Sequence, residues 1–238
     1  MNLKPEGMNP VVVAFTGAVY SGKTTTIELT SKLLMSWGHK VVTCNEAAKE
    51  ILEEYARKLY GSSNLSEVLD DMRKSPIYLK FQKDVIEKQH NFERLTYREA
   101  LRQGADVVLI DRTILDWLWF FMLYCGKYSK SEEFVECLSY YNMCVCPNTH
   151  YDIVFLCDYS DIIDDYGNTS YRSIDDTTFI SRLAQHNFIE AMLKISKFDY
   201  ITLRGRPIER AEFAVKKIDK LVQERAVEAK IKERDSDE

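Results

Sequence analysis

The sequence has no run of about 18 consecutive apolar residues, and it therefore predicts no transmembrane helix. Its longest apolar stretch, residues 114–124, is shorter than a membrane span and contains Asp116. The N-terminal segment is polar and lacks the apolar centre of a signal peptide. No internal repeat and no Gly/Ser-rich linker divides the 238 residues, so we expect one domain in a cytoplasmic protein.

Two patterns that would indicate zinc or nucleic acid are also missing. The six cysteines form no Cys-x-x-Cys pair, so we predict no structural zinc site and expect reduced thiols packed in the interior. Cys144, Cys146 and His150 lie close in sequence, but their spacing is only a weak metal pattern. The formal net charge of −5 argues against non-specific binding to nucleic acid, although it leaves room for a local basic groove.

Short β-branched segments alternate with helical segments along the chain. Strands are predicted at residues 11–16, 40–44, 106–111, 151–158 and 198–203. Helices are predicted at residues 21–37, 46–60, 63–104 with a break before Pro76, 113–124, 131–142, 179–195 and 207–232. Continuous apolar strands separated by helices are typical of parallel sheets that are buried on both faces. The sequence therefore predicts a three-layer α/β fold with a five-stranded parallel sheet, which binds ligands at the carboxyl ends of its strands.

A phosphate-binding motif follows the first predicted strand. Residues 17–24 read G-x-x-x-x-G-K-T between a predicted strand and a predicted helix, which is the context of a P-loop. The glycines let backbone N–H groups face phosphate oxygens, and the helix N-terminus adds partial positive charge. We expect Lys23 to reach the β- and γ-phosphates of a nucleotide and the Thr24 hydroxyl to bind Mg²⁺. The predicted nucleotide-binding residues here are Gly17, Ala18, Val19, Tyr20, Ser21, Gly22, Lys23, Thr24 and Thr25.

Charged residues follow the second and third predicted strands. Asp111 ends the third strand, where a carboxylate can hold Mg²⁺ together with Thr24 or can cap the next helix. Arg112 follows it at once, beside the expected phosphates. Glu46 follows the second strand and can act as a general base or as an acid in the first turn of a helix. For Asp116, contact with a substrate and a structural capping role are equal alternatives.

Arginines occur in and after a polar, aspartate-rich loop at residues 159–177. Arg172 and Arg182 can close on the phosphates and stabilise the charge of a transferring group, or they can pair with the nearby aspartates. Arg206 follows the last predicted strand, in a loop that we assign to the nucleotide by analogy with other P-loop proteins.

Together these motifs resemble the AAA-type P-loop nucleotide and nucleoside kinases. This family includes ribosylnicotinamide kinase domains, and the sequence is also similar to the deoxynucleoside kinases. The resemblance spans residues 10 to 210 and rests on residues 17–24, 45–52, 81–89, 109–116 and 151–156. It implies phosphoryl transfer from ATP with Mg²⁺ to a small acceptor of the nucleoside, nucleotide or nicotinamide riboside class. It also implies that Glu46 is the base, and that Asp111 and Arg112 serve the metal and the phosphate.

Two features depart from the family pattern. Thr113 stands where a serine is usual, and Arg172 lies further than usual from the Asp-x-Gly sequence at residues 165–167. The expected organisation is a flexible N-terminus at 1–9, one P-loop domain at 10–232 and a disordered tail at 233–238. Within the domain, we expect a helical insert on the acceptor side at 63–104 and a lid at 159–190.

Two other functions fit the same motifs. A polynucleotide 5′-kinase would accept a nucleic-acid end, and the basic residues of 94–102 keep that alternative open. A nucleotide-dependent ATPase switch would instead bind a partner protein. A GTPase is not expected, because no N-K-x-D motif follows a strand. The sequence indicates no membrane partner and does not indicate an oligomeric state.

Overall fold

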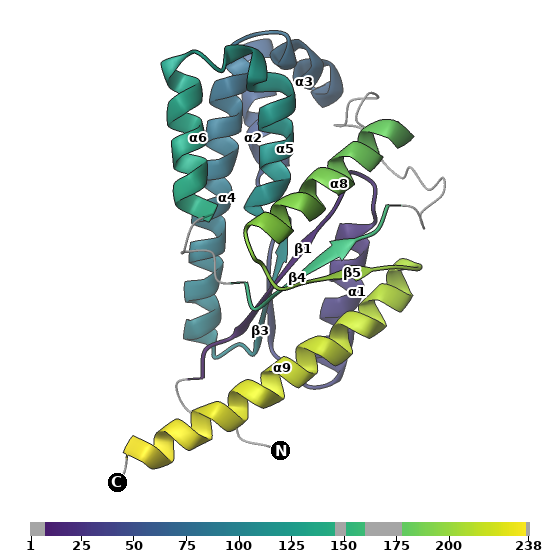
Figure 1. Ribbon diagram of the computed structural model, residues 1–238, viewed down its shortest axis with the longest axis vertical. Helices are drawn as coiled ribbons and strands as arrows, with labels where there is room; N and C mark the ends of the chain where they lie inside the picture. Colours follow the sequence, from purple (N-terminus) through teal and green to yellow (C-terminus); the bar gives the residue numbers. More distant parts are fainter. Residues whose placement is uncertain (1–7, 146–150, 160–177, 237–238) are drawn as a thin grey trace.

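The computed structural model describes residues 8–145, 151–159 and 178–236. Five strands form one parallel sheet in the order β2-β3-β1-β4-β5 (Figure 1). Their bounds are β1 Val11–Thr16, β2 Val41–Cys44, β3 Val107–Asp111, β4 Ile153–Cys157 and β5 Tyr200–Leu203. Each strand lies where the sequence predicts one, so the predicted α/β fold with a five-stranded parallel sheet is confirmed.

Strand β1 lies at the centre of the sheet because it is apolar on both faces. All six of its residues are buried, and Val13 is paired with Leu109 of β3 and with Ile153 of β4. Since every pair is parallel, the carboxyl ends of the strands lie at one edge of the sheet. The segments that follow β1, β2 and β3, which carry the predicted site residues, therefore meet at that edge.

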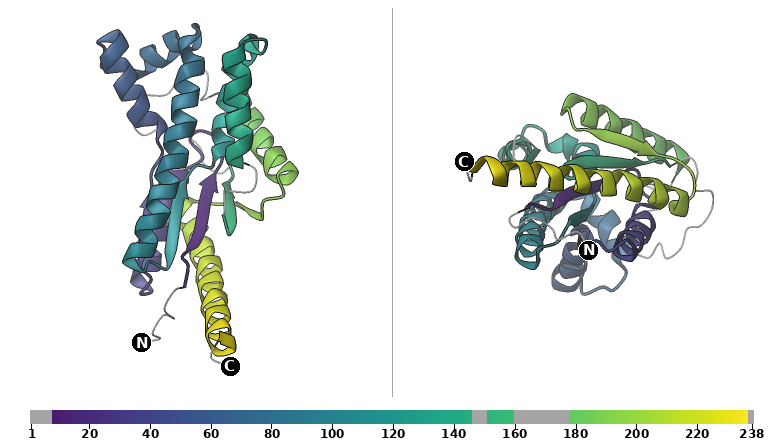
Figure 2. Two further views of the ribbon diagram at one scale, coloured as in Figure 1. Left: turned by 90° about the vertical axis from the view of Figure 1, so that its left-hand side faces the viewer. Right: turned by 90° about the horizontal axis from the view of Figure 1, so that it is seen from below.

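Helices cover both faces of the sheet (Figure 2). On one face, α1 (Lys23–Ser36) and α9 (Pro207–Ser236) pack against each other over an apolar cluster that includes Val13 and Phe155. On the other face, α4 (Ile77–Gln103), α5 (Ile114–Cys125) and α8 (Phe179–Ile195) share a second apolar cluster. The sheet is thus the middle of three layers, and each apolar side of its strands faces a helical layer.

The remaining helices project beyond the carboxyl edge of the sheet (Figure 1). They are α2 (Ala48–Tyr55), a π-helical turn (Ala56–Tyr60), α3 (Leu65–Arg73), a 3₁₀ turn (Gly126–Tyr128) and α6 (Glu132–Val145). The predicted insert at 63–104 thus consists of α3 and α4, and the predicted break before Pro76 separates them. These helices stand next to the edge at which a ligand is expected.

Three predicted boundaries differ from the structure. Residues 46–60 form α2 and a π-helical turn rather than one regular helix, and Gly61 ends the turn with a φ of 59°. The final helix ends at Ser236 rather than at residue 232, so residues 233–236, which were expected to be disordered, are helical. Met8, in the segment predicted to be flexible, is buried against the cluster of α1 and α9.

Within the described ranges, none of the helices combines the length and the hydropathy that crossing a bilayer requires.

Candidate active site

The P-loop joins β1 to α1 at the carboxyl edge of the sheet. Gly17 has a φ of 143°, and a Cβ atom there would lie 2.6 Å from the Cys157 carbonyl oxygen, so only glycine fits. Gly22 has a φ of 74° at the N-cap of α1. Thr24 and Thr25 follow in the first turn of α1, and their side chains are exposed. The sequence thus places a glycine at each sharp bend that brings backbone N–H groups toward a ligand.

Lys23 is buried against the P-loop. Its ammonium group donates to the carbonyl oxygens of Gly17 at 2.8 Å and Ala18 at 2.7 Å. Burial, reinforced by the nearby Arg112, lowers the pKa of Lys23 to about 7. The charged form is therefore costly here, and the negative charge of a phosphate group would relieve that cost.

Thr24 and Asp111 approach each other from α1 and β3. The Thr24 hydroxyl donates to Asp111 Oδ2 at 2.8 Å. Asp111 Oδ1 is buried and accepts no hydrogen bond from the described residues. Burial and the neighbouring Glu46 raise the pKa of Asp111. A hydroxyl oxygen and a buried carboxylate with a spare oxygen are a donor set that fits Mg²⁺, whose charge would stabilise the ionised Asp111.

Arg112 holds the carboxylates of two different elements. Its guanidinium lies 2.9 Å from Glu46 and 3.2 Å from Asp116. Burial alone would lower the pKa of this guanidinium, but Glu46, Asp116 and Asp111 raise it well above its ordinary value. The backbone of Arg112 adopts a φ of 75°, and its N–H donates to Phe15 at 2.9 Å. A positive φ at a buried, non-glycine residue is unusual and is found most often at functional sites.

Asp116 has the structural capping role that is one of its two expected alternatives. Its Oδ2 accepts from the Thr113 backbone N–H and hydroxyl, both at 2.9 Å, and from the Thr16 hydroxyl at 2.6 Å. This capping box begins α5, and the Asp116 side chain is fully buried. Thr113, where the family pattern has serine, supplies the same hydroxyl group. Asp116 therefore supports Arg112 rather than facing an open cleft.

Glu46 also borders a small pocket next to the P-loop edge of the sheet. The pocket measures about 40 Å³ and is enclosed by α2, α3, α4 and α5. Its aromatic lining comes from Tyr78, Phe81, Trp117 and Phe120. Gln82 lines it as well, and its Oε1 atom is buried without a hydrogen-bond partner among the described residues. A buried acceptor atom beside aromatic rings is suited to a planar molecule that carries an N–H group.

Two residues that are distant in sequence, on helices α8 and α9, form hydrogen bonds with the P-loop. Gln185 of α8 accepts from the Val19 backbone N–H at 2.9 Å. Arg210 of α9 is fully buried and donates to the carbonyl oxygens of Ser21 at 2.5 Å and Asp158 at 2.6 Å. Neither residue is predicted from the sequence, because both lie on ordinary helices, 166 and 189 residues away from their partners, and no motif surrounds them.

These residues lie within a region that matches a known family. Residues 12–210 match the family described as AAA domain. The chain belongs to the AAA domain family. The resemblance to an AAA-type P-loop family, which the sequence motifs indicate, is thereby confirmed. The matched region of the AAA domain extends from β1 to the first turn of α9, so it contains all the site residues described above.

One solved structure that is similar to this AAA domain is thymidylate kinase from Ehrlichia chaffeensis. The TM-score is 0.48 and the sequence identity is 18%, over 90% of this chain and 99% of that chain. No curated protein matches the sequence.

Of the three other arginines predicted in the site of this AAA domain, the structure describes Arg182 and Arg206, and both contact residues outside the P-loop. Arg206 is exposed and pairs with Glu209 in the first turn of α9, at 2.8 Å. Arg172 lies outside the described residues. Arg182 of α8 is buried, and it donates to the Tyr159 carbonyl oxygen at 2.8 Å. Of the expected lid at 159–190, the structure describes only Tyr159 and residues 178–190.

The weak metal pattern receives no structural test. The side chains of Cys144, Cys146 and His150 all lie outside the described residues. In the part of the chain that the structure describes, no group of three or more His, Cys, Asp or Glu side chains is placed to hold a metal ion. The donor pair of Thr24 and Asp111 has only one carboxylate, which is how Mg²⁺ is commonly held when a bound nucleotide supplies further oxygens.

Proposed function

We propose that this AAA domain protein is a kinase that transfers the γ-phosphate of ATP to a hydroxyl group of a small, nucleoside-like acceptor. The position of Glu46 carries the proposal. This carboxylate pairs with Arg112 at the P-loop edge of the sheet and also lines the aromatic pocket. A hydroxyl group of a molecule in that pocket would therefore lie between a carboxylate and the phosphates of a bound nucleotide.

The nucleotide site would be formed by the P-loop. The backbone N–H groups of residues 17–24 and the ammonium of Lys23 would hold the phosphates, with Lys23 exchanging its two carbonyl partners for phosphate oxygens. Thr24 and Asp111 would hold Mg²⁺. When bound, Mg²⁺ neutralises charge on the β- and γ-phosphate oxygens. The unpartnered Oδ1 atom of Asp111 and the burial of Lys23 support this assignment.

The transfer step follows from the same geometry. The acceptor oxygen bonds to the γ-phosphorus, the bond from that phosphorus to the β–γ bridging oxygen breaks, and ADP leaves. Glu46 accepts the proton of the acceptor hydroxyl. Arg112 orients Glu46 and lies where it can stabilise negative charge on the transferring group. Arg182 and Arg172 are the lid arginines proposed to close on the phosphates, and Arg206 is proposed to flank the nucleotide.

The acceptor pocket favours a planar base. The rings of Phe81, Trp117 and Phe120 provide flat apolar surface, and the unpaired Oε1 of Gln82 can accept an N–H group. Its volume of about 40 Å³ is far below the several hundred Å³ of an occupied ligand site. We therefore propose that α3 moves away from α5 when the acceptor enters.

The first experiment measures transfer from γ-labelled ATP with Mg²⁺. The acceptors are nucleosides, nucleoside monophosphates, nicotinamide riboside and a 5′-hydroxyl oligonucleotide. We expect label in one small-molecule class, and no label with Lys23→Ala, which excludes a contaminating kinase. Label only in the oligonucleotide would establish a polynucleotide 5′-kinase instead. Release of free phosphate alone would reject the kinase and favour an ATPase switch.

The role of Glu46 is tested with a matched pair of variants. Glu46→Gln keeps the shape of the side chain but removes the proton acceptor, so kcat should fall by about 100- to 10,000-fold while KM for ATP changes little. Glu53→Gln, on the exposed side of α2, serves as the control and should retain full activity. Equal kcat values for Glu46→Gln and the wild type would exclude Glu46 as the base.

A further inference from the structure

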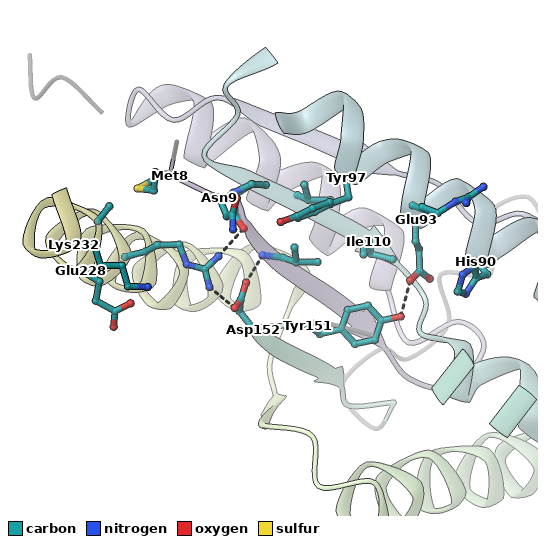
Figure 3. Close-up of a pocket in the computed structure, with 16 residues that line it drawn as sticks. Met8, Asn9, His90, Glu93, Tyr97, Ile110, Tyr151, Asp152, Glu228 and Lys232 are labelled. Carbon is teal, nitrogen blue, oxygen red and sulfur yellow. Dashed lines mark hydrogen bonds and ion pairs between the residues drawn. The ribbon is translucent and has the colours of Figure 1, made fainter. Parts of the chain in front are cut away.

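A second, larger cavity lies beside β3 and the segments that precede β1 and β4 (Figure 3). Its volume is about 750 Å³, which is within the range of small-molecule sites. Residues that precede β1 and β4 form its floor, and α4 and the C-terminal half of α9 form its walls. We call it the basal cavity and define it by Glu93, Tyr97, Ile110, Tyr151 and Arg225, which all line it.

Glu93 is a carboxylate that lines the cavity and has no role in the P-loop site. The Tyr151 hydroxyl donates to Glu93 Oε2 at 3.0 Å (Figure 3). Gln89 donates to Glu93 Oε1 at 3.2 Å. No lysine or arginine of the described residues forms an ion pair with this carboxylate. Burial raises the pKa of Glu93 to about 7. A carboxylate that lines a cavity, is costly to ionise and lacks a cation partner is a candidate for a ligand-binding group.

Among the described residues, no ion pair joins Glu93 to the basic residues that line the cavity, which are His90, Arg94, Arg225 and Lys232. Arg225 pairs with Asp152 and also donates to the Pro10 carbonyl oxygen at 2.7 Å. Arg94 is exposed and donates to Asn91 at 3.3 Å. Glu93 therefore has no direct cationic partner among these residues. Tyr97 lies one helical turn after Glu93 on α4, so both side chains belong to one face of the helix.

We infer that the basal cavity binds a small organic cation, with an ammonium group against Glu93 and an apolar ring between Tyr97, Ile110 and Tyr151. The ammonium group would supply the missing counter-charge, and tyrosine rings attract cations through their negative faces. The apolar side chains along the sheet would cover the ring of the ligand. An anionic ligand would meet the Glu93 carboxylate instead, so the cavity should select against it.

The cavity is connected to the proposed active site by hydrogen bonds. Gln89, which donates to Glu93, is fully buried and accepts from the Ala47 backbone N–H at 3.0 Å. Ala47 directly follows Glu46. A cation that draws the Glu93 carboxylate toward itself would shift Gln89, and the hydrogen bond between Gln89 and the Ala47 N–H would change. This coupling rests on the proposed function of Glu46, and it would make the cation an effector of the kinase.

The binding test uses phenethylamine as the cationic probe and 3-phenylpropionate as an anionic probe with the same ring. Binding to the full chain, without nucleotide or acceptor, is measured by saturation-transfer NMR and titration calorimetry, so the result is independent of any kinase activity. We expect phenethylamine to bind at least tenfold more tightly than 3-phenylpropionate. Equal affinities, tighter binding of the anion, or no binding of either probe would overturn the proposal.

Two variants locate the site. Glu93→Gln should weaken phenethylamine binding at least tenfold, whereas Glu99→Gln, a half-buried control on the same helix that does not line the cavity, should leave it unchanged. If Glu93→Gln does not fold, Tyr97→Leu serves instead and should weaken binding severalfold with an unchanged circular dichroism spectrum. Wild-type affinity in the folded variant would overturn the proposal.

The coupling has a separate readout. Hydrogen exchange at the Ala47 amide should change when phenethylamine saturates the protein, and Gln89→Leu should abolish that change. An unchanged Ala47 amide in the saturated wild-type protein would overturn the coupling to Glu46.

Discussion

Glu93 shows how the environment of one residue can make stability depend on pH. Its folded-state pKa of about 7 exceeds the ordinary value of 4.5 because burial disfavours the ionised carboxylate. Below pH 4.5 the side chain is protonated in both states, and no penalty arises. As the pH rises from 4.5 to 7, the unfolded chain releases the proton first, so the free energy of unfolding falls by up to about 3 kcal/mol. Above pH 7 the penalty is constant.

Glu93→Gln should remove this dependence. Urea unfolding at several pH values should show the variant gaining stability relative to the wild type between pH 4.5 and 7, with no further change above pH 7. Glu99→Gln is the control, because the hydrogen bonds of Glu99 with Arg102 and Gln103 lower its pKa to about 2, so Glu99 does not titrate between pH 4.5 and 7. A constant difference between wild type and Glu93→Gln across this range would show that the carboxylate is well solvated.

The residues of the candidate site divide into those that a sequence can indicate and those that it cannot. Lys23, Asp111 and Glu46 were predicted because each follows a strand, and parallel strands end at one edge of the sheet. Gln185 and Arg210 contact the P-loop through helices whose polar faces look like solvent-exposed surface in the sequence. Only the packing of the complete chain shows that they are buried.

At the scale of elements, strands were easier to predict than helix ends. Strand β1 is a continuous β-branched run, and its bounds match the predicted 11–16. Helix α8 also has its predicted bounds, because Thr178 caps it by accepting from the Ser181 N–H at 3.2 Å. By contrast, α9 continues past its predicted end, since no glycine or proline marks where it stops.

Helix α8 acts as a support for the P-loop. Its buried polar residues Arg182, Gln185 and His186 lie three and four positions apart and therefore share one face. Gln185 is the member of this face that contacts the loop, through the Val19 N–H. Burial lowers the pKa of His186, so this face is expected to carry little imidazolium charge near neutral pH.

Removing the Gln185 contact should loosen the P-loop. In Gln185→Leu the buried Val19 N–H loses its partner, which should lower the free energy of unfolding by about 1 to 3 kcal/mol. Hydrogen exchange measured by mass spectrometry should be faster in peptides that contain residues 17–22. Gln223→Leu, at an exposed position of α9, is the control and should change neither quantity. Unchanged exchange in the P-loop of Gln185→Leu would mean that α8 does not support it.

At the scale of the whole molecule, one sheet joins both helical layers, so ligand binding at its carboxyl edge should stabilise the entire chain. The P-loop lies between β1 and α1, while Arg210 of α9 and Gln185 of α8 hold it from the two layers. A nucleotide bound there would add its free energy of binding to the free energy of unfolding. At a ligand concentration 100 times Kd, this amounts to about 2.7 kcal/mol, which corresponds to a rise in Tm of roughly 5 to 11 °C for a chain of this size.

Calorimetry with ATP and Mg²⁺ should therefore show one transition that moves as a unit to higher temperature. The shift should be smaller with ATP alone, because the buried Asp111 carboxylate then lacks a metal ion to balance its charge. Lys23→Ala should abolish most of the shift, whereas Lys32→Ala, an exposed position of the same helix α1, should retain it. If the wild type and Lys23→Ala shifted equally, the nucleotide would bind elsewhere. If the transition split in two, with only one part shifting, the helical layers would unfold independently and the sheet would not couple them.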